Sequence, residues 1–219
     1  LVHVAPLMCR TWLVPSSYEF AERENQMMWE AVQRDQEDVD VRYRLAHALH
    51  RPEVRRRFDI VIFDLPPRMS LGTVNALIAS HWLLVQMVLD KLSADAVPRF
   101  LSQMSGLKSD LDIDLRLAGI VGVMHRVRQR SDEEELTWSN LGSEAEEWLY
   151  DGFGLIEPTL PRRQAFPNSA GEKLTILEDA EVRDEFLVPI FFELSQRIGL
   201  ISRQSSDQSH EDETATALN

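Results

Sequence analysis

The chain has 219 residues, of which 44% are hydrophobic, a formal net charge of −13 and a single cysteine, Cys9. This length suffices for one full domain, while the lone cysteine excludes an internal disulfide and a multi-cysteine metal site and fits a reducing cytoplasm. No apolar run is long enough for a membrane span. The negative net charge argues against a protein that coats nucleic acid through its overall electrostatic field, although a local basic patch is compatible with this charge.

The first half of the chain predicts alternating strands and helices. Apolar residues at helical spacing mark the helices, and short apolar runs bounded by prolines and serines mark the strands. The predicted elements are a short strand at 11–14, a helix at 19–34, a helix beginning near 41 and ending near Pro52, a strand at 58–64, a helix at 71–79, a strand at 81–88 and a helix at 93–104.

The second half continues the alternation. The predicted elements are a strand at 117–124 with glycines that permit close packing, a helix at 136–150, a short strand at 155–157 that stops at Pro158, a loop at 161–171 and a helix at 181–198 that Pro189 kinks. The segment 202–219 lacks aromatic residues and is acidic, so we expect a disordered tail there.

The stretch FDIVIFDLPP, residues 58–67, predicts a strand that ends at the ligand-binding edge of a sheet. Its consecutive apolar residues favour a strand buried on both faces of a parallel sheet. Asp64 ends that strand, and Pro66 and Pro67 stop it because proline cannot donate to the ladder. Ligands bind off the carboxyl ends of strands in open α/β sheets, so Asp64 predicts metal or phosphate chemistry. The structural alternative is a carboxylate that caps a turn.

Four blocks in order carry a resemblance to a known family. The segment FDIVIFDLPPRMSLGTVNALIAS is similar to the Walker B strand and switch of ParA-type ATPases, which belong to the MinD/ParA deviant-Walker P-loop family. WLVPSS, LRLAGIVGVM and IEPTLPRRQAFPNSAGEKLTI resemble further blocks of that family, and together they cover roughly residues 11–200. The resemblance implies a three-layer α/β/α fold with a mostly parallel sheet, P-loop NTPase-like and incomplete at the N-terminus. We expect this domain over residues 1–201, followed by the tail at 202–219.

The phosphate-binding loop of the family has no match in these residues. No G-x-x-x-x-G-K-[ST] pattern occurs, so the backbone amides and lysine that neutralise phosphates are not among them. Two explanations stay open: the chain, which begins with Leu1, is the C-terminal part of a longer ParA-like protein, or it is a relative that has lost the loop. Whether this chain is an enzyme is therefore open, and we expect it to be inactive alone.

The resemblance assigns roles to individual positions. Asp64 matches the catalytic Walker B aspartate, which holds Mg²⁺ through water. Pro66 and Pro67 match a loop that senses the γ-phosphate, with a plain strand terminator as the alternative. The expected cofactors are accordingly ATP and Mg²⁺. Base-side contacts are expected from Met124, at the end of a strand with His125, and from Pro161 and Arg162 in the Pro-Arg loop.

The family also implies partners. We expect a homodimer that binds non-specific DNA, a centromere-binding ParB-type partner protein, no membrane, and a cytoplasmic, nucleoid-associated location. The function implied is plasmid or chromosome partitioning, and the alternative is a non-catalytic regulatory or interaction protein derived from the family. Solvated charge is the competing interpretation of the arginines that are candidates for DNA binding, namely Arg126, Arg128, Arg130 and Arg163.

The chain departs from the family pattern in two places. The strand HWLLVQMVLDKLSA lacks the usual following proline pair, and Phe166, Pro167 and Asn168 replace the usual residues after the arginine. Outside the resemblance, His47 and His50 share helical spacing, for which a solvated face is the favoured interpretation over a metal site. No G-x-S-x-G nucleophile elbow occurs.

Overall fold

The computed structural model describes residues 2–3, 10–17, 19–33, 40–66, 68–125, 130–146, 154–172 and 176–200. The predicted tail at 202–219 lies outside these ranges. The strands are β1 (Val2–His3), β2 (Trp12–Leu13), β3 (Trp82–Val88), β4 (Arg116–His125) and β5 (Leu155–Pro161). The helices are α1 (Phe20–Gln33), a 3₁₀ turn η2 (Val41–Tyr43), α2 (Arg44–Leu49), α3 (Pro52–Arg55), α4 (Leu71–Ile78), α5 (Lys91–Leu111), α6 (Asp132–Glu146), α7 (Ala165–Glu172), a 3₁₀ turn η3 (Ile176–Glu178), α8 (Ala180–Val182), a π-helical turn η4 (Arg183–Leu187) and α9 (Val188–Arg197).

A parallel sheet of three described strands, in the order β3-β4-β5, forms the centre of the fold. Val85 of β3 pairs with Ile120 of β4, and Val121 of β4 pairs with Ile156 of β5. The sequence predicts β3 and β4 to within a residue or two at their ends. Parallel strands buried on both faces are nearly continuous apolar runs, and these two strands have that pattern. β1 and β2 form a separate antiparallel pair.

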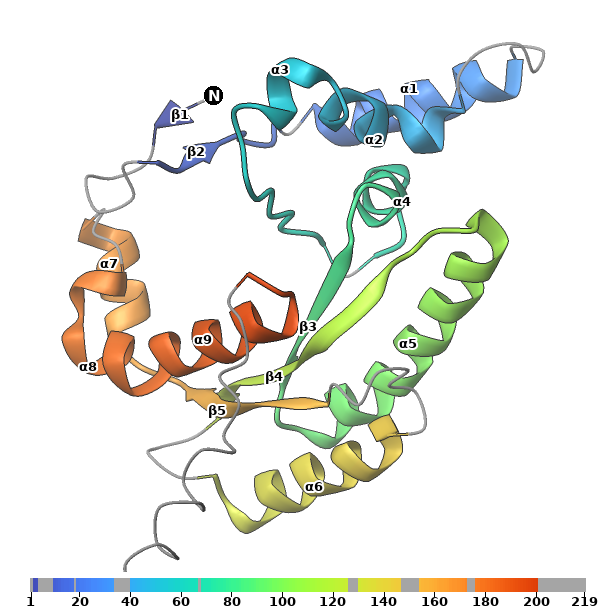
Figure 1. Ribbon diagram of the computed structural model, residues 1–219. Helices are drawn as coiled ribbons and strands as arrows, with labels where there is room; N and C mark the ends of the chain where they lie inside the picture. The colour runs from blue at the N-terminus through green and yellow to red at the C-terminus, as the bar shows by residue number, and fades with distance from the viewer. Residues whose placement is uncertain are drawn as a thin grey trace, which may run out of the picture.

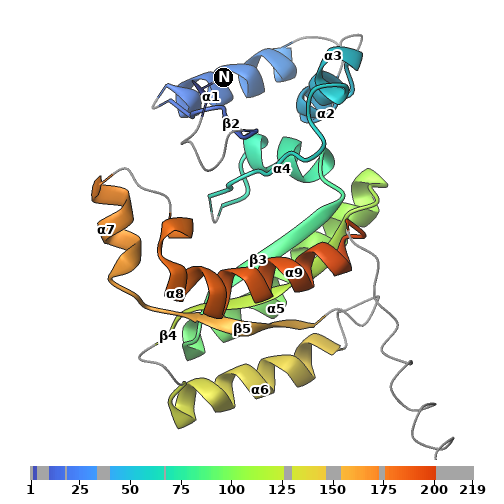
Figure 2. The same cartoon turned by 60° about the vertical axis from the view of Figure 1, so that its left-hand side comes forward.

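Helices cover both faces of this sheet, so the predicted three-layer α/β/α arrangement is confirmed (Figures 1 and 2). On one face α5 and α6 pack against β3 and β4 around Val85, Ile120 and Trp138. On the other face α9 buries Ile190 against Val121 and Ile156. Burial of such side chains contributes about 1.5–3 kcal/mol each to folding, so the two faces supply the main stabilisation of the domain.

Two glycines let neighbouring elements approach β4 closely, as the sequence predicts. A Cβ atom on Gly122 would lie 2.8 Å from side-chain atoms of Leu89 and Thr159. Gly119 has a φ of +148°, and a Cβ atom there would lie 2.6 Å from the Arg197 guanidinium. A larger residue at either position would push the packed layers apart.

The predicted strand at 58–64 is wrong for the described structure. These residues form no strand, and Ile60, Val61 and Ile62 are exposed, Ile62 by 86%. The cause is that β3 pairs only with β4, and no described strand lies beside 58–64 to accept its backbone hydrogen bonds. A buried apolar pattern is thus present in the sequence without the partner that would turn it into a strand.

The predicted elements around β5 also need correction. β5 does not stop at Pro158 but continues to Pro161, because the strand bulges there: Val121 and Val123 of β4 face Ile156 and Leu160. Proline is tolerated at a bulge, where no ladder hydrogen bond is needed. The predicted loop at 161–171 is largely helix α7. Pro167 is in its first turn, whose amides have no acceptor within the helix.

Helix α6 begins four residues earlier than predicted, because a capping box fixes its start. The Ser131 amide donates to a Glu134 carboxylate oxygen at 2.7 Å, and the Glu134 amide donates to the Ser131 hydroxyl at 3.3 Å. This reciprocal pair satisfies amides that the first turn leaves free. The S-x-x-E pattern was present in the sequence and would have located the boundary.

The C-terminal helical region changes its hydrogen-bond pattern just before Pro189, and the kink expected at this proline stays a prediction. The π-helical turn at 183–187 directly precedes α9, in which Pro189 occupies the second position. Proline has no amide to donate to the preceding turn, and a π-helical turn is one way in which a helix accommodates such a change.

Candidate functional site

Two short-range backbone hydrogen bonds precede α4. The Arg68 amide donates to the Pro66 carbonyl at 2.7 Å, and the Ser70 amide donates to the Arg68 carbonyl at 3.2 Å. Asp64 is exposed, and within the described ranges its carboxylate makes no hydrogen bond or ion pair. An exposed, uncommitted carboxylate can serve a hard cation that keeps its waters. Pro67 lies outside the described residues.

The N-terminus of α4 is capped from two directions. Ser70 accepts a hydrogen bond from the Thr73 amide at 3.3 Å, while the Thr73 hydroxyl donates to the Arg68 carbonyl at 2.8 Å. Glu24 of α1, which is buried, accepts from the Gly72 amide at 2.5 Å and lies 4.0 Å from the Arg68 guanidinium. The positive end of the helix dipole stabilises a carboxylate at this position. The conformation of the segment after Asp64 is therefore coupled to α1.

The predicted base-side residues lie together at the carboxyl ends of β4 and β5. His125 and Pro161 face each other in the strand register, and the Arg162 amide donates to the His125 carbonyl at 2.9 Å. Met124 has a φ of +60° and is exposed, and the Arg162 side chain is exposed. This edge is where open parallel sheets bind ligands.

The ring of His125 is buried at this edge. Its Nε2 atom lies 3.4 Å from the Thr159 carbonyl oxygen, and its Nδ1 atom has no hydrogen-bond partner. A buried polar atom without a partner is uncommon in folded proteins. His125 therefore adds a polar group to the edge that also presents Met124 and Arg162.

Asp64 does not lie with these residues. The adjacent Leu65 packs against a cluster that contains Leu77 and Leu115, and Leu115 directly precedes the first residue of β4. The segment before α4 thus lies near the amino ends of β3 and β4, whereas Met124 and Pro161 lie at the carboxyl ends of β4 and β5. The described structure therefore holds two separate parts of the predicted site.

Two of the predicted DNA-binding arginines are engaged in ion pairs within the chain. Arg130 pairs with Glu135 at 2.7 Å and with Glu157 at 2.8 Å, above the ring of Trp138. The same Glu157 carboxylate accepts from the Trp138 indole nitrogen at 2.7 Å, so Arg130 and Glu157 join α6 to β5.

Arg163 pairs with Glu181 at 3.1 Å and Glu185 at 3.6 Å and lies over the ring of Phe186. Its side chain is about four-fifths buried in these contacts. Arg130 and Arg163 accordingly hold elements together in this structure, and Arg126 and Arg128 lie outside the described residues.

Two structurally important polar residues escaped the sequence predictions. Asn75, buried in α4, donates to the Val41 carbonyl at 2.9 Å and the Leu71 carbonyl at 3.0 Å, and accepts from the Leu45 amide at 3.1 Å. The signal was an amide inside the apolar run LGTVNALI. Arg197 of α9 donates to the carbonyls of 118, 154 and 155 at 3.0–3.1 Å, across the start of β4 and β5, and no sequence pattern indicated that role.

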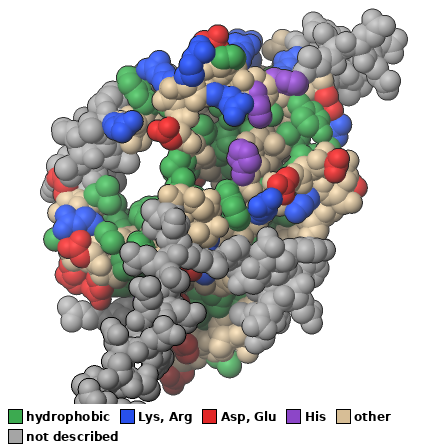
Figure 3. Space-filling model, viewed as in Figure 1, with side chains coloured by type: hydrophobic (Ala, Val, Ile, Leu, Met, Phe, Trp, Pro, Cys, Tyr) green, Lys and Arg blue, Asp and Glu red, His purple; other side chains and the backbone are tan. Residues whose placement is uncertain are grey.

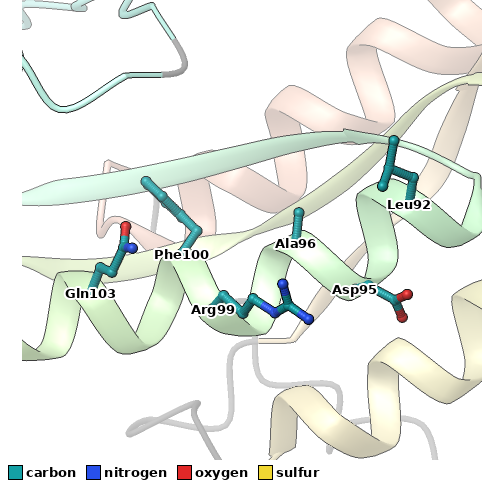
Figure 4. A pocket seen from close by; sticks show the side chains of 6 residues that line it. All are labelled: Leu92, Asp95, Ala96, Arg99, Phe100 and Gln103. Atoms are coloured by element: carbon teal, nitrogen blue, oxygen red, sulfur yellow. The ribbon is translucent and has the colours of Figure 1, made fainter.

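A shallow hollow of about 290 Å³ lies along one helix and contains none of these residues (Figure 4). All six residues that line it come from α5: Leu92, Asp95, Ala96, Arg99, Phe100 and Gln103.

In the part of the chain that the structure describes, no cluster of three metal-ligating side chains occurs, and His47 and His50 are both exposed. None of the described helices is long and apolar enough to span a membrane.

The fold is that of the P-loop NTPases, as comparison with solved structures shows. Apo McdA from Cyanothece superposes with a TM-score of 0.67 at 13% identity, over 85% of this chain and 68% of that one. An ATP complex of a Cyanothece McdA variant gives the same score at 14% identity, over 85% and 65%. Cobyrinic acid a,c-diamide synthase from Mycobacterium smegmatis, with bound ADP and magnesium, gives 0.53 at 24% identity, over 69% and 55%.

The sequence comparison identifies the family. The family model AAA_31, described as an AAA domain, matches residues 3–117, and the chain belongs to this family of ParA/MinD-type P-loop NTPases. Two curated proteins of Pseudomonas putida, an uncharacterised protein and an uncharacterised protein in the gidB 3′ region, are each 26% identical over 85 residues, or 39% of this chain. The matched segment spans 32% of the length of these relatives.

Proposed function

We propose that this protein is a ParA-type ATPase that partitions plasmid or chromosomal DNA. The observation that carries the proposal is the family match over residues 3–117, which contains Asp64 and the capped start of α4, the region that resembles the switch. McdA, whose fold this chain shares, has been solved with ATP, and the diamide synthase with ADP and magnesium. These complexes make ATP with Mg²⁺ the expected ligands here.

The residues fit these ligands in part. Asp64 offers an exposed carboxylate for a water-bridged Mg²⁺, which would neutralise charge on the phosphates when bound. The edge formed by Met124, His125, Pro161 and Arg162 offers a surface for the base. Because these two parts lie at opposite ends of the strands, binding requires residues 58–66 to move so that Asp64 reaches the carboxyl ends of the strands.

The partners follow from the same proposal. A homodimer is the expected ATP-bound form, and a ParB-type protein is the partner expected to stimulate hydrolysis. The dimer is expected to bind duplex DNA without sequence preference and to be cytoplasmic and nucleoid-associated. A domain over residues 1–201 carries these activities.

The coding sequence upstream of Leu1 tests the proposal most directly. An in-frame segment encoding a Gly-Lys-Thr phosphate loop supports an ATPase, and a start codon without that loop rejects it. In a protein that contains the loop, we expect Asp64→Asn to reduce ATP turnover at least about a hundredfold, since the positioned metal supplies several kcal/mol of transition-state stabilisation. The matched control is Asp59→Asn, an exposed aspartate five residues earlier, and equal loss in both variants contradicts the role of Asp64.

A non-catalytic interaction protein is the second candidate function. The absence of a G-x-x-x-x-G-K-[ST] pattern from these 219 residues favours it. In that case the protein keeps its partner surfaces, and nucleotide has no effect on its oligomeric state in sedimentation experiments.

A further inference from the structure

The arginines of this acidic chain are concentrated in one short region. Residues 42–57 contain six arginines, one glutamate and two histidines, in a chain whose formal net charge is −13. With the histidines neutral, this region carries a net charge of +5. It comprises most of η2, all of α2 and α3, and the two residues after α3. Figure 3 shows Lys, Arg and His side chains gathered over the region of α2 and α3.

Four arginines of this region have no carboxylate partner within the described ranges. They are Arg44, Arg51, Arg55 and Arg56, whose side chains are exposed, and we call them the α2–α3 basic surface. Arginines elsewhere in the described structure do have carboxylate partners, as shown by Arg116, Arg130, Arg163, Arg183 and Arg197. The α2–α3 basic surface is therefore a concentration of positive charge that the described part of the chain leaves unneutralised.

Two sets of contacts hold this surface at the end of the sheet where β4 begins. The Asn75 side chain ties η2 and α2 to α4. The Tyr43 hydroxyl of η2 donates to the Leu111 carbonyl, at the end of α5, at 3.3 Å. Because α5 leads into β4, η2 and α2 lie near the amino end of that strand.

The charge that complements this surface is carried by residues 202–219, which we call the acidic segment. Four carboxylates against one arginine, Arg203, give it a net charge of −3 with its histidine neutral. The carboxylates belong to Asp207, Glu211, Asp212 and Glu213. Leu218 is its single large apolar residue, so its contact with a folded domain has to be mainly electrostatic.

The acidic segment starts within reach of the basic surface. The Arg197 side chain, at the end of α9, donates to the Ala118 carbonyl near the start of β4 at 3.1 Å. The chain from Leu200 to Glu211 reaches at most about 36–40 Å, since an extended chain spans about 3.3–3.6 Å per residue. This reach is about twice the radius of gyration of about 16 Å expected for a compact domain of about 200 residues.

We infer that the acidic segment docks on the α2–α3 basic surface of its own chain, with Glu211, Asp212 and Glu213 as the main contacts. The planar fork of an arginine matches the two oxygens of a carboxylate. Exposed ion pairs are individually weak, but attachment to the same chain gives the segment an effective concentration on the order of millimolar. The docked segment covers the four arginines and keeps other anions away from them. This contact goes beyond the proposed function, and it requires no nucleotide.

The test is paramagnetic broadening in the NMR spectrum of the full chain without nucleotide. A nitroxide is attached at Ser209→Cys in a Cys9→Ser background, close to the three consecutive carboxylates. At about 0.1 M salt, where the Debye length is about 10 Å, we expect the amide signals of residues 44–56 to lose intensity and those of 91–103 in α5 to keep it. At about 1 M salt, where the Debye length is about 3 Å, this loss should disappear.

An exchange of charges separates a specific contact from general attraction. The two variants are Glu211→Lys with Asp212→Lys and Glu213→Lys in the acidic segment, and Arg51→Glu with Arg55→Glu and Arg56→Glu on the basic surface. Each variant alone places like charges opposite each other and should abolish the intensity loss, whereas their combination should restore it. The matched control is Lys91→Gln with Arg99→Gln, which removes two exposed charges from α5 and should leave the intensity loss unchanged.

Each result decides the inference. An intensity loss confined to residues 44–56, abolished by each variant and restored by their combination, supports it. No loss in the unchanged chain, equal loss over 91–103, or a loss that persists in the acidic-segment variant overturns it. That variant changes no residue of the described domain, so its result stands even if the basic-surface variant fails to fold.

A mixed sample distinguishes the same chain from a second copy as the source of the segment. It combines a spin-labelled chain without isotope enrichment with an isotope-enriched chain that carries no spin label. An equal intensity loss in this mixture assigns the contact to a second copy and overturns the inference, and unchanged intensity supports it. Because nucleotide is absent throughout, failure here leaves the proposed ATPase function standing.

Discussion

Single side chains decide how the first helices attach to the sheet domain. The Asn75 side chain hydrogen-bonds the carbonyl of Val41 and the amide of Leu45, which lie 34 and 30 positions earlier in the chain. Such groups are costly when left unpaired inside a protein. The sequence shows Asn75 as a polar residue in an apolar helix, but only the folded structure shows that its partners are η2 and α2.

At this scale we predict that Asn75→Ala lowers the free energy of unfolding by about 3 kcal/mol, because it removes three hydrogen bonds and leaves partly buried backbone groups unpaired. Urea denaturation followed by circular dichroism measures the change. Asn140→Ala, which truncates an exposed asparagine of α6, is the control and should change stability by less than about 0.5 kcal/mol. A similar loss in both variants would show that Asn75 has no special role.

Whole elements depend on a neighbour in a way that single residues do not. Residues 58–64 have the apolar pattern of a buried strand, yet they form none, whereas β3 with a similar pattern is paired along its length with β4. The apolar sequence pattern favours a strand, but a segment forms one only where an adjacent strand is present to pair with it.

We therefore predict rapid amide hydrogen exchange at residues 60–63 and slow exchange at 120–123 of β4. Exchange followed by mass spectrometry on the unmodified chain compares the two segments in one sample. Slow exchange at 60–63 in a monomer would show that another strand pairs with this segment.

The glycines of α5 and β4 give an opposed pair of predictions. Gly106 is inside α5, and an added Cβ would meet no atom within 4 Å beyond its chain neighbours and the adjacent backbone of its own helix, so Gly106→Ala should stabilise the fold by about 0.5–1 kcal/mol. Gly122→Ala forces a methyl group against Leu89 and Thr159 and should destabilise it by about 1–3 kcal/mol. Thermal unfolding of both variants checks the signs, and a stabilising Gly122→Ala would refute the close-packing argument.

At the scale of the whole molecule, catalysis requires groups that converge on one point. Asp64 and the Met124–Arg162 edge lie at opposite ends of the described strands, and no phosphate-binding loop occurs in these residues. Phosphoryl transfer depends on positioned charge around the phosphates.

The 219-residue chain alone should accordingly release no measurable phosphate from ATP and Mg²⁺. A steady-state phosphate-release assay tests this expectation. The same preparation carrying Asp64→Ala is the control for contaminating enzymes, which the substitution leaves unaffected. Turnover that disappears in the Asp64→Ala protein would contradict the prediction.

Local patterns in the sequence determined much of this protein. The apolar runs of β3 and β4 and the helical spacing of α1, α4 and α9 predict those elements because they depend on side chains close together in the chain. The ordered motifs predict the family for the same reason. Tertiary structure alone decided that 58–64 stays unpaired, that β5 bulges past Pro158, and that Arg130 and Arg163 form internal ion pairs. These outcomes depend on which strand or carboxylate lies alongside in space, and distant residues become neighbours only when the chain folds.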